Sequence, residues 1–485
     1  MVVVGNGMAG SRVVEELRRR DPARMLGVTI VGAERAPAYN RILLTEVLAG
    51  RHSGEELGLV PGGWHDDHGV DLVTGDPVDT LDRAARKVVT ASGRVLPYDV
   101  LVLATGADAA LPDIEGLRTE AGQLLPNAFA LRTLDDLREL QRARRHATRA
   151  VVLGGGLLGL EVGRGLVASG LETVVVHVGP HLLDRQLDST AGNVLVRAAA
   201  GVGLASRIGR AVTRIVRNAD GAVGGVELDD GTCVLADLLV LATGARPQVG
   251  LARAAGLRVE RGIVVDDTLR SVDDPRVFAL GDCAEHDGVV AGLVAPAWEQ
   301  AAVIAAQLTG ADPAARYRGS RVAARLKADG LHVAAMGARD AELPGDDVVV
   351  VADTAQGTYR KLVVRDGRIA GATVVGELST VGVLTQLFTR QARLPGDRVS
   401  LLAPGSGTTS TPAASPSLMP AGTTVCSCNG VTKGAIQQAV LGGSRSVAAV
   451  ARATRATTGC GGCRDVVSGI VDWLAAADPQ VEVNA

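Results

Sequence analysis

The feature that most constrains the fold is a glycine pattern that occurs twice along the chain. The first copy reads Gly5-Asn6-Gly7-Met8-Ala9-Gly10 and directly follows the apolar run Val2–Val4. A helical pattern then continues to Arg20, and a second apolar strand leads to Glu34. A strand, this glycine turn, a helix, a second strand and an acid in that order are the fingerprint of a dinucleotide-binding βαβ unit. The sequence therefore predicts a Rossmann-like domain at its start.

Each position of this first copy has a physical reason. Gly5 makes the tight turn, Gly7 lets a pyrophosphate approach the helix N-terminus, and Gly10 lets the helix pack closely on the strand. Glu34 is placed to accept hydrogen bonds from ribose hydroxyls. Asn6 and Ala9 lie within the same turn and are included in the predicted binding site.

The second copy follows the run Val151–Leu153 and predicts a second nucleotide site. Its predicted binding residues are Gly154, Gly156, Leu158 and Gly159. The acid that favours NAD by repelling a 2′-phosphate is absent, because His177 stands near the end of the next strand. His177, His181 and Arg185 could face a phosphate, yet no arginine directly follows the strand. NADH and NADPH both remain open, and we favour NADH.

Composition sets the class and excludes polymer binding. The chain has 485 residues, 47% of them hydrophobic, enough for several cores. Acidic and basic residues are scattered and the net charge is −3, which argues against nucleic acid or anionic lipid as a partner. We find no membrane span and no signal peptide, and expect a cytoplasmic protein. Apolar runs without alternation suit parallel strands covered on both faces, so the class is α/β.

The order of patterns predicts two nested Rossmann-like domains, an α+β interface domain and a small helical module. A stretch rich in Gly, Ser, Thr, Pro and Ala precedes that module and has the composition of a flexible tether. The expected divisions are a first nucleotide domain in two parts (1–110 and 242–312), an inserted nucleotide domain (111–241), the α+β domain (313–400), the linker (401–424) and the C-terminal module (425–485).

Four of the six cysteines lie in the C-terminal module, as Cys426-Ser427-Cys428 and Cys460-Gly461-Gly462-Cys463. In a reducing compartment such pairs indicate metal ligation rather than disulfides. Four thiolates can hold a [2Fe–2S] cluster, and structural zinc is the alternative. Thr432 and Ser446 are expected to cap two short helices between the pairs, with a stop at Gly442.

Three further motifs make the first 400 residues resemble the glutathione-reductase-like FAD flavoproteins. They are Ala104-Thr105-Gly106, Ala242-Thr243-Gly244-Ala245-Arg246-Pro247 and Gly281-Asp282-Cys283. The resemblance implies that Asp282 binds the ribityl chain of FAD and that Thr105, Gly106 and Gly244 belong to the cofactor sites. It also implies that Glu161 lies beside the nicotinamide as the catalytic residue. A helix from Ala297 to Leu308 would point its N-terminus at the flavin.

The thiols of the nucleotide domains do not match those of related enzymes. Disulfide reductases carry a redox cysteine pair there, and this sequence has none, which excludes disulfide reduction. A thiol peroxidase or oxidase would need a cysteine where Tyr39–Leu44 stands. For the two single cysteines, Cys233 and Cys283, we expect a buried, apolar role. Electrons therefore need another exit, which the C-terminal cysteines can provide.

The whole chain resembles the large subunit of NAD(P)H-dependent assimilatory nitrite reductase and the electron-transfer subunit of assimilatory nitrate reductase. Its C-terminal module resembles the bacterioferritin-associated-ferredoxin-like cluster domain. This resemblance adds Arg41 and Val78 to the FAD site and implies a partner, either a molybdenum nitrate reductase or a sirohaem nitrite reductase subunit. Because no sirohaem domain follows within the sequence, we do not expect the chain to reduce nitrite by itself.

Other functions remain open at this point. The chain could be a stand-alone NADH oxidase or a ferredoxin or rubredoxin reductase, with a structural metal in its C-terminal module. It could also be a redox or iron sensor, or a subunit of an amine or cyanide-forming dehydrogenase. The second glycine turn favours NAD(P)H as electron donor over this last reading.

Overall fold

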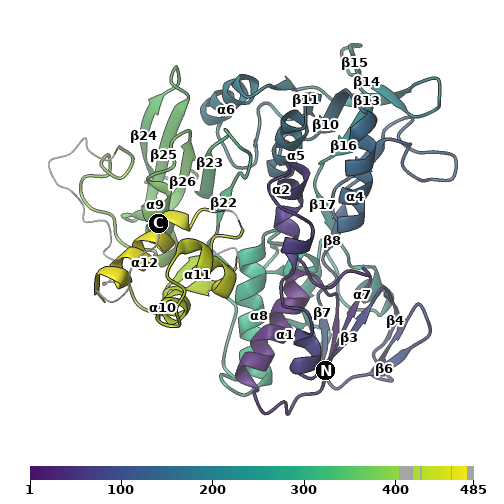
Figure 1. The fold of residues 1–485 in the computed structure, drawn as a ribbon, viewed down its shortest axis with the longest axis vertical. Coiled ribbons are helices and arrows are strands. Elements are labelled where there is room, and N and C mark those ends of the chain that lie inside the picture. The colour runs from purple at the N-terminus through teal and green to yellow at the C-terminus, as the bar shows by residue number, and fades with distance from the viewer. Residues whose placement is uncertain (404–418, 427–428, 460, 478–485) are drawn as a thin grey trace.

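The computed structural model describes residues 1–403, 419–426, 429–459 and 461–477. Two of the predicted cluster ligands, Cys428 and Cys460, and most of the predicted linker lie outside these ranges. Figure 1 shows two nucleotide-binding domains one above the other, an antiparallel domain beside the upper one, and the C-terminal module beside the lower one. The α/β class and the presence of two Rossmann-like domains are confirmed.

The first Rossmann-like domain is built on an eight-stranded sheet with the order β21-β18-β19-β20-β7-β1-β2-β3. Five neighbouring strands, β20, β7, β1, β2 and the edge strand β3, run parallel. Helices α1 and α8 pack against each other beside it. The bounds are β1 Val2–Val4, α1 Met8–Arg20, β2 Val28–Gly32, β3 Val70–Thr74, β7 Leu101–Leu103, β18 Ile263–Val265, β19 Arg270–Ser271, β20 Asp274–Ala279, β21 Ala284–His286 and α8 Val294–Leu308.

The strands at the centre of this sheet are apolar on both faces, as the sequence pattern predicts. Every residue of β1 and β7 is buried, and full burial of one such side chain contributes about 1.5–3 kcal/mol. Outside its main sheet, the first domain contains a small antiparallel sheet and short helices. These are α2 Leu44–Leu48, α3 Trp64–Asp67, β4 Val78–Asp82, β5 Lys87–Thr90, β6 Val95–Pro97 and α7 Gly250–Ala254.

The second Rossmann-like domain is inserted into the first and has a five-stranded parallel sheet, ordered β12-β11-β10-β16-β9. Strands β8 and β17, which pair antiparallel, lead into it and out of it. The bounds are β8 Ala107–Ala109, β9 Ala128–Ala130, α4 Leu134–Ala143, β10 Arg149–Leu153, α5 Leu157–Ala168, β11 Glu172–His177, α6 Ser189–Gly201, β12 Leu204–Ile208, β13 Val212–Arg217, β14 Val223–Leu228, β15 Cys233–Leu235, β16 Leu238–Leu241 and β17 Ala245–Pro247.

An antiparallel sheet of the order β22-β23-β26-β25-β24 follows, with one helix on it. The bounds are β22 Ala323–Arg325, β23 Val333–Gly337, β24 Asp347–Asp353, β25 Thr358–Arg365, β26 Arg368–Val375 and α9 Val381–Arg390. This sheet is tied to the second domain where Tyr359 and Lys361 donate hydrogen bonds to Asp188, the N-cap of α6.

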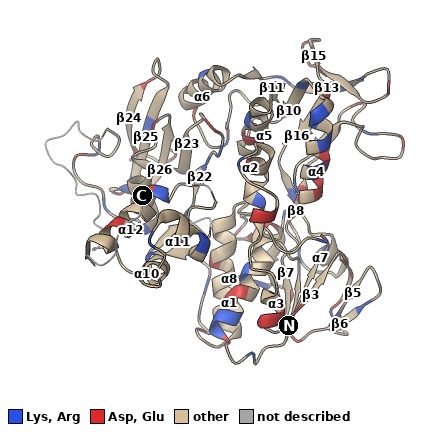
Figure 2. Ribbon diagram, in the orientation of Figure 1, with Lys and Arg blue, Asp and Glu red and all other residues tan. Residues whose placement is uncertain are grey.

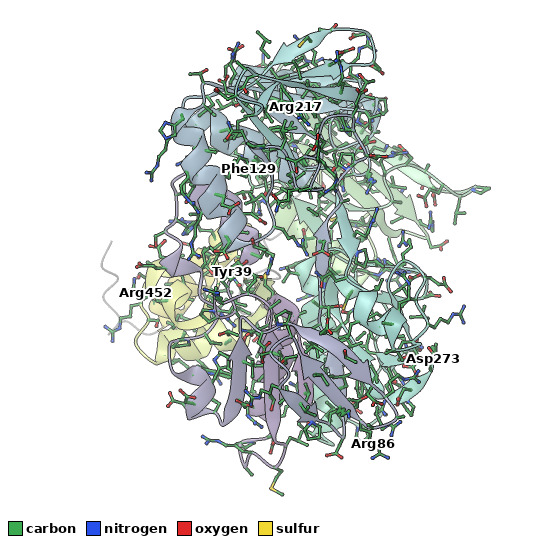
Figure 3. All side chains as sticks on the ribbon, turned by 90° about the vertical axis from the view of Figure 1, so that its right-hand side faces the viewer. Tyr39, Arg86, Phe129, Arg217, Asp273 and Arg452 are labelled. Carbon is green, nitrogen blue, oxygen red and sulfur yellow. The ribbon has the colours of Figure 1, made fainter. Side chains whose placement is uncertain are left out.

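The C-terminal module has its own hydrophobic core and lies against the first domain (Figures 1 and 3). Its elements are β27 Thr424–Cys426, β28 Val431–Thr432, α10 Lys433–Leu441, α11 Val447–Thr454 and α12 Arg464–Ala477. Thr432 caps α10 by accepting from the backbone N–H of Ala435, and Ser446 caps α11 through that of Ala449. The predicted caps are confirmed, as is the stop at Gly442.

Three local predictions need correction. Helix α8 begins at Val294 rather than Ala297, because Pro296 fits the first turn, where no backbone N–H has a partner inside the helix. Strand β2 ends at Gly32, so Glu34 lies in the loop beyond it. Cys233 is exposed, because β15 lies at the edge of a small three-stranded sheet, so the expected buried role is wrong for this thiol.

Charged residues of both signs are distributed over all parts of the ribbon (Figure 2). Among the helices that the structure describes, none combines the length and the apolar character needed to cross a bilayer.

Candidate functional site

The first glycine turn leaves no room for side chains next to the strand. Gly5 has a φ of 113°, and a Cβ there would run into the carbonyl oxygen of Ala104 at the end of β7. A Cβ on Gly10 would run into the carbonyl oxygen of Gly5. The two glycines therefore bring α1 against β1 and β7, which fixes the position of the N-terminus of α1.

The space in front of that N-terminus fits a dinucleotide pyrophosphate. No side chain caps α1 at Gly7, and no described atom lies within 4 Å of the position of a Cβ there. Both side-chain amide atoms of Asn6 are buried without a hydrogen-bond partner in the described part of the chain. Open backbone N–H groups and an unsatisfied amide are what an anionic phosphate requires.

Glu34 lies in a polar group formed by the loop after β2. Its carboxylate accepts from the Tyr39 hydroxyl at 2.7 Å and from the Arg41 guanidinium at 2.5 Å. Burial, together with the bond to Glu34, raises the pKa of Tyr39. Arg41 also donates to the carbonyl of Arg132. These bonds hold the part-exposed Glu34 carboxylate in one orientation, on the side where the fingerprint expects ribose.

Asp282 follows β20 and carries a partner that the sequence did not indicate. Arg132 donates to its carboxylate at 2.7 Å and to the carbonyl of Ala107 at 2.9 Å. Behind Asp282, a Cβ on Gly281 would contact the methyl groups of Ala9 and of Ala297 in α8. Helix α8 begins without a side-chain cap. The arrangement brings α1, α8 and Asp282 to one place, as a flavin site requires.

The remaining residues predicted for the cofactor sites lie in three different places. The Thr105 hydroxyl donates a hydrogen bond to the carbonyl of Gln248 at 2.6 Å. This bond supports the connection formed by β8 and β17, so the hydroxyl hydrogen does not point toward a ligand. Gly106 directly precedes β8 and Gly244 directly precedes β17, and their φ values are 75° and 117°. Val78 begins β4 and is half-buried.

The second glycine turn has nearly the same geometry as the first. Gly154 has a φ of 114°, and a Cβ there would run into the carbonyl oxygen of Ala242. A Cβ on Gly159 would run into the carbonyl oxygen of Gly154. Helix α5 begins at Gly156 without a side-chain cap and with open space in front of it. Leu158, in its first turn, is exposed at the same end. This turn fits a second pyrophosphate.

His177 ends β11 beside this second turn. Its Nε2 lies 3.3 Å from the Asp184 carboxylate, outside hydrogen-bond geometry, and has no hydrogen-bond partner in the described part of the chain. His181 is buried under α6, so it cannot meet a nucleotide phosphate as the sequence suggested, whereas Arg185 is exposed. His177 lies against the glycine turn, because a Cβ on Gly155 would stand 2.8 Å from its ring.

Glu161 in α5 lies where three parts of the molecule meet. Its carboxylate accepts from the Lys327 ammonium at 2.8 Å and from the Thr45 hydroxyl at 3.0 Å. The Lys327 ammonium donates also to the carbonyl of Ile42 at 2.9 Å. The side chains of Glu161 and Lys327 are only 6% and 12% exposed. A buried carboxylate with a charged partner is held in one orientation, and sequence reasoning had no signal for Lys327.

Two of the four predicted cluster ligands lie within the described residues. Cys426 and Cys463 are both buried in the core of the C-terminal module. Asn429 directs its side-chain amide to the Cys426 sulfur at 3.8 Å and to the carbonyl of Arg455 at 2.6 Å. An N–H group that points at a sulfur stabilises the negative charge of a ligating thiolate. Without Cys428 and Cys460, the described residues contain no group of three or more metal-ligating side chains.

Cys283, beside Asp282, is fully buried. Burial raises the pKa of this thiol, and its sulfur contacts the carbonyls of Leu103 and Leu280. This is the buried role that the sequence predicts for Cys283, because a neutral thiol in such surroundings is unreactive.

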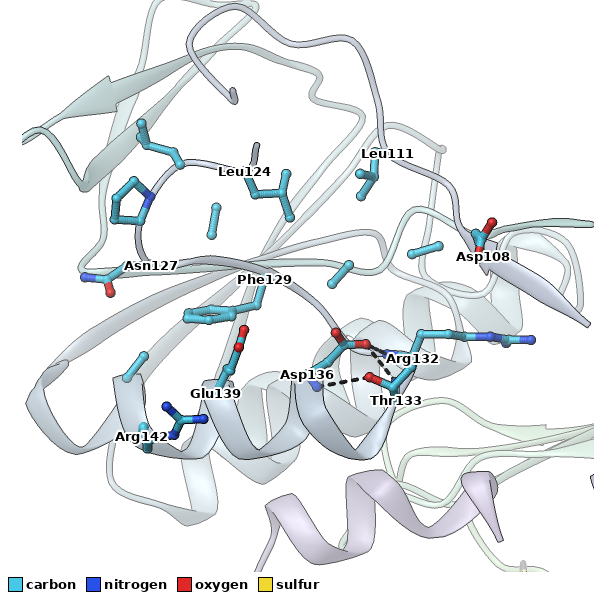
Figure 4. Close-up of a pocket in the computed structure, with 16 residues that line it drawn as sticks. Asp108, Leu111, Leu124, Asn127, Phe129, Arg132, Thr133, Asp136, Glu139 and Arg142 are labelled. Carbon is cyan, nitrogen blue, oxygen red and sulfur yellow. Dashed lines mark hydrogen bonds between the residues drawn. The ribbon is translucent and has the colours of Figure 1, made fainter. Parts of the chain in front are cut away.

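A cavity of about 710 Å³ lies between β9 and α4, apart from both glycine turns (Figure 4). Its wall includes Phe129, Glu139 and the capping box of Thr133 and Asp136. None of the residues predicted to bind a cofactor lines it. Arg132, the partner of Asp282, also lines this cavity and connects it with the candidate flavin site.

Comparison with family models divides the chain in the same way. Residues 1–306 match the pyridine nucleotide-disulphide oxidoreductase family, and residues 323–392 match the rubredoxin NAD+ reductase C-terminal domain. Residues 424–473 match the BFD-like [2Fe-2S] binding domain. These matches assign FAD and NAD(P)H to the two Rossmann-like domains and a [2Fe–2S] cluster to the C-terminal module.

Two curated relatives match almost the whole chain. A nitrite reductase [NAD(P)H] of Bacillus subtilis (strain 168) is 36% identical over 99% of this chain and 58% of its own length. The assimilatory nitrate reductase electron transfer subunit of the same organism is 34% identical over 98% of this chain and 59% of its own length. The chain thus spans just under three-fifths of the length of each of them.

Among solved structures, a ferredoxin reductase of the CYP199A2 system from Rhodopseudomonas palustris is similar, with a TM-score of 0.69 and 29% identity. The match covers 77% of this chain and 90% of that one. Together with the two glycine turns and the buried thiols, these findings establish that the chain belongs to the pyridine nucleotide-disulphide oxidoreductase family and carries a BFD-like [2Fe–2S] binding domain.

Proposed function

We propose that this chain takes hydride from NADH or NADPH and delivers electrons, one at a time, to a separate reductase of nitrate or nitrite. The observation that carries the proposal is the combination of two nucleotide turns with a module that buries Cys426 and Cys463 in one core. The cysteines of the two nucleotide domains are Cys233, which is exposed in the inserted domain, and Cys283, which is buried in the first domain. They therefore form no pair that could accept the electrons. The C-terminal thiols are the remaining outlet.

When bound, FAD converts a two-electron hydride into single electrons, and the cluster carries these singly. The chain's own residues bind and orient these groups. Gly7 and Gly156 each leave an uncapped helix N-terminus for a pyrophosphate. Asp282, held by Arg132, accepts from ribityl hydroxyls. Helix α8 offers its N-terminal N–H groups where negative charge develops.

Glu161 is the proposed positioning carboxylate beside the nicotinamide. Lys327 and Thr45 hold it from two sides, so it can accept a hydrogen bond from the carboxamide without reorienting. Because Lys327 lies in the connection between β22 and β23 of the antiparallel sheet, the orientation of Glu161 depends on how that domain is docked. Because Lys327 is paired with Glu161, the carboxylate does not present an unpaired negative charge to the nicotinamide.

The proposed acceptor is a molybdenum nitrate reductase, with a sirohaem nitrite reductase subunit as the second choice. The names of the two Bacillus subtilis relatives support this choice, since one is a nitrite reductase and the other an electron transfer subunit of assimilatory nitrate reductase. A cytoplasmic site of action is part of the proposal, because ligating thiols persist in a reducing compartment.

The experiment compares Cys463→Ser with a control, Cys233→Ser, on the purified protein. Iron and acid-labile sulfide are measured first. NADH oxidation is then followed with an artificial two-electron dye and with a purified nitrate reductase plus nitrate. We expect Cys463→Ser to keep the dye reaction and to lose at least 90% of nitrate reduction, and Cys233→Ser to keep both. Nitrate reduction at the wild-type rate by a cluster-free variant would overturn the proposal.

A further inference from the structure

The C-terminal module touches the first domain through a charged contact. Arg455, which ends α11, donates to the Glu15 carboxylate of α1 at 2.9 Å and to the carbonyl of Leu59. The side chains of Arg455 and Glu15 are 28% and 17% exposed, so the pair is partly shielded from water. Glu15 lies about two helical turns after Gly7, the N-cap of α1. The contact thus joins the module to the helix that serves the flavin site.

A second contact lies next to Cys426. Gly430 has a φ of 62°, and a Cβ there would stand 3.1 Å from the Arg12 guanidinium and 3.6 Å from the ring of Trp298. Arg12 in turn lies over the Trp298 ring at 5.3 Å. The absence of a side chain at Gly430 therefore lets the loop after the first cysteines approach α1 and α8 closely.

A third contact lies next to Cys463. A side chain on Gly462 would collide with the guanidinium of Arg325 at the end of β22. Arg325 is two residues from Lys327, which holds Glu161. The segment that orients the nicotinamide-side carboxylate thus also contacts the cysteine-bearing loop.

These contacts turn the cysteine-bearing loops toward the flavin site. Trp298 is adjacent to Ala297, and the methyl group of Ala297 faces Gly281 beside Asp282. The loops of both described cysteines approach this end of the molecule, one at Trp298 and one at Arg325. Figure 3 shows the module against the first domain, with Arg452 of the same helix α11 on its outer side.

We propose that Arg12, Glu15, Trp298 and Arg325 form a docking surface for the chain's own cluster module, and that the Arg455–Glu15 ion pair latches the module in its electron-receiving position. The inference rests on the proposed function and adds the electron transfer within the molecule, from the flavin site to the cluster module. NADH supplies two electrons, so one NADH oxidised matches two reductions of the docked cluster. A partly exposed ion pair is a weak and salt-screened contact, which lets the module leave the surface to meet an acceptor.

The test uses Arg455→Glu in the full, cofactor-loaded chain. The matched control is Arg452→Glu, which makes the same charge change on the exposed side of α11. The rescue variant combines Arg455→Glu with Glu15→Arg. Stopped-flow absorbance follows reduction of the flavin by NADH, and freeze-quench paramagnetic resonance follows the cluster. Hydroxyl-radical labelling of Trp298, with no NADH present, reports docking without any catalysis.

We expect Arg455→Glu to slow cluster reduction about tenfold, because two carboxylates then face each other across the contact. Flavin reduction should keep its rate, and Trp298 labelling should rise at least twofold. The rescue variant should recover most of both effects, and the control should show neither. Glu15→Arg alone, which leaves the module's own residues untouched, should reproduce the defect even if Arg455→Glu fails to retain iron.

Unchanged cluster reduction and unchanged Trp298 labelling in both single variants would overturn the docking surface while leaving the proposed function intact. A wild-type cluster that NADH never reduces would instead overturn the proposed function. In that case Trp298 labelling still decides whether the latch exists.

Discussion

The two nucleotide domains share a backbone geometry and differ in the side chains around it. Gly5 and Gly154 have φ values of 113° and 114°, and each faces the carbonyl of an alanine, Ala104 or Ala242. Past the second strand the domains diverge, since Glu34 is bonded to Tyr39 and Arg41 whereas His177 has only Asp184 nearby. We propose that the shared backbone geometry positions a pyrophosphate in each domain and that the residues beyond it distinguish the nucleotides.

Each domain also presents one carboxylate with a cationic partner, and the two pairs differ in burial. Glu161 and Lys327 are 6% and 12% exposed, whereas Asp282 and Arg132 are 27% and 29% exposed. Lys327→Met should therefore destabilise the protein by about 3 kcal/mol, because it leaves a buried charge unpaired. Arg132→Met should cost about 1 kcal/mol or less.

Denaturant unfolding of the FAD-loaded proteins measures both changes. Lys327→Arg, which keeps the charge, serves as a control and should lose less than Lys327→Met. Equal losses for Lys327→Met and Arg132→Met would show that burial does not separate the two pairs.

The shared backbone geometry predicts a separation of nucleotide losses. In Gly10→Ala and Gly159→Ala, the new methyl group collides with the carbonyl of Gly5 or Gly154. Each variant should lose about 2 kcal/mol of binding, or about 30-fold in Kd, for its own nucleotide. Gly10→Ala should weaken FAD, while Gly159→Ala should keep FAD and weaken NADH.

Flavin fluorescence and NADH titration measure the two affinities. Gly201→Ala in α6, where a Cβ would meet no neighbouring side chain or loop within 4 Å, is the control for a helical Gly→Ala change without a collision. Loss of FAD from Gly159→Ala would break the assignment of the two turns.

The divergent side chains predict a change in coenzyme preference. His177→Asp restores the acid that the second turn lacks, and its charge adds to that of Asp184 close by. We expect the Kd for NADPH to rise about tenfold relative to that for NADH, by repulsion of the 2′-phosphate. The ratio of kcat/KM for the two coenzymes checks this, and an unchanged ratio would show that His177 does not face the 2′ position.

The second domain is anchored by a charged group that predicts a pH effect. Burial opposes ionisation of Asp188, but bonds from Ala191, Lys361 and Tyr359 outweigh it and lower its pKa. Because the folded pKa is below the unfolded value of 3.8, Asp188 stabilises the fold fully above that pH. This contribution is lost as the pH falls through the folded pKa.

Asp188→Asn should therefore be about 1 kcal/mol less stable than the wild type at pH 7, with the gap closing below about pH 4. Urea unfolding at several pH values measures the gap. Asp135→Asn, which removes an exposed carboxylate of the same domain, should show no such gap. A gap that persists at low pH would mean that Asp188 acts by something other than its charge.

The sequence was sufficient for features that depend on neighbouring residues. The glycine turns, the buried parallel strands and the caps at Thr432 and Ser446 all follow from local patterns. The partners Lys327, Arg132 and Arg455 did not, because they lie 166, 150 and 440 residues from the carboxylates that they meet. No spacing rule reaches such pairs, which only the packing of domains brings together.

The central claim is that electrons enter at the second glycine turn and leave through the C-terminal cluster. An anaerobic NADH titration of the purified protein tests it most directly, with visible absorbance for the flavin and paramagnetic resonance for the cluster. The account predicts that both centres become reduced and that iron and sulfide are present. Reduction of the flavin alone, in a protein without iron, would contradict it and make the C-terminal module a structural one.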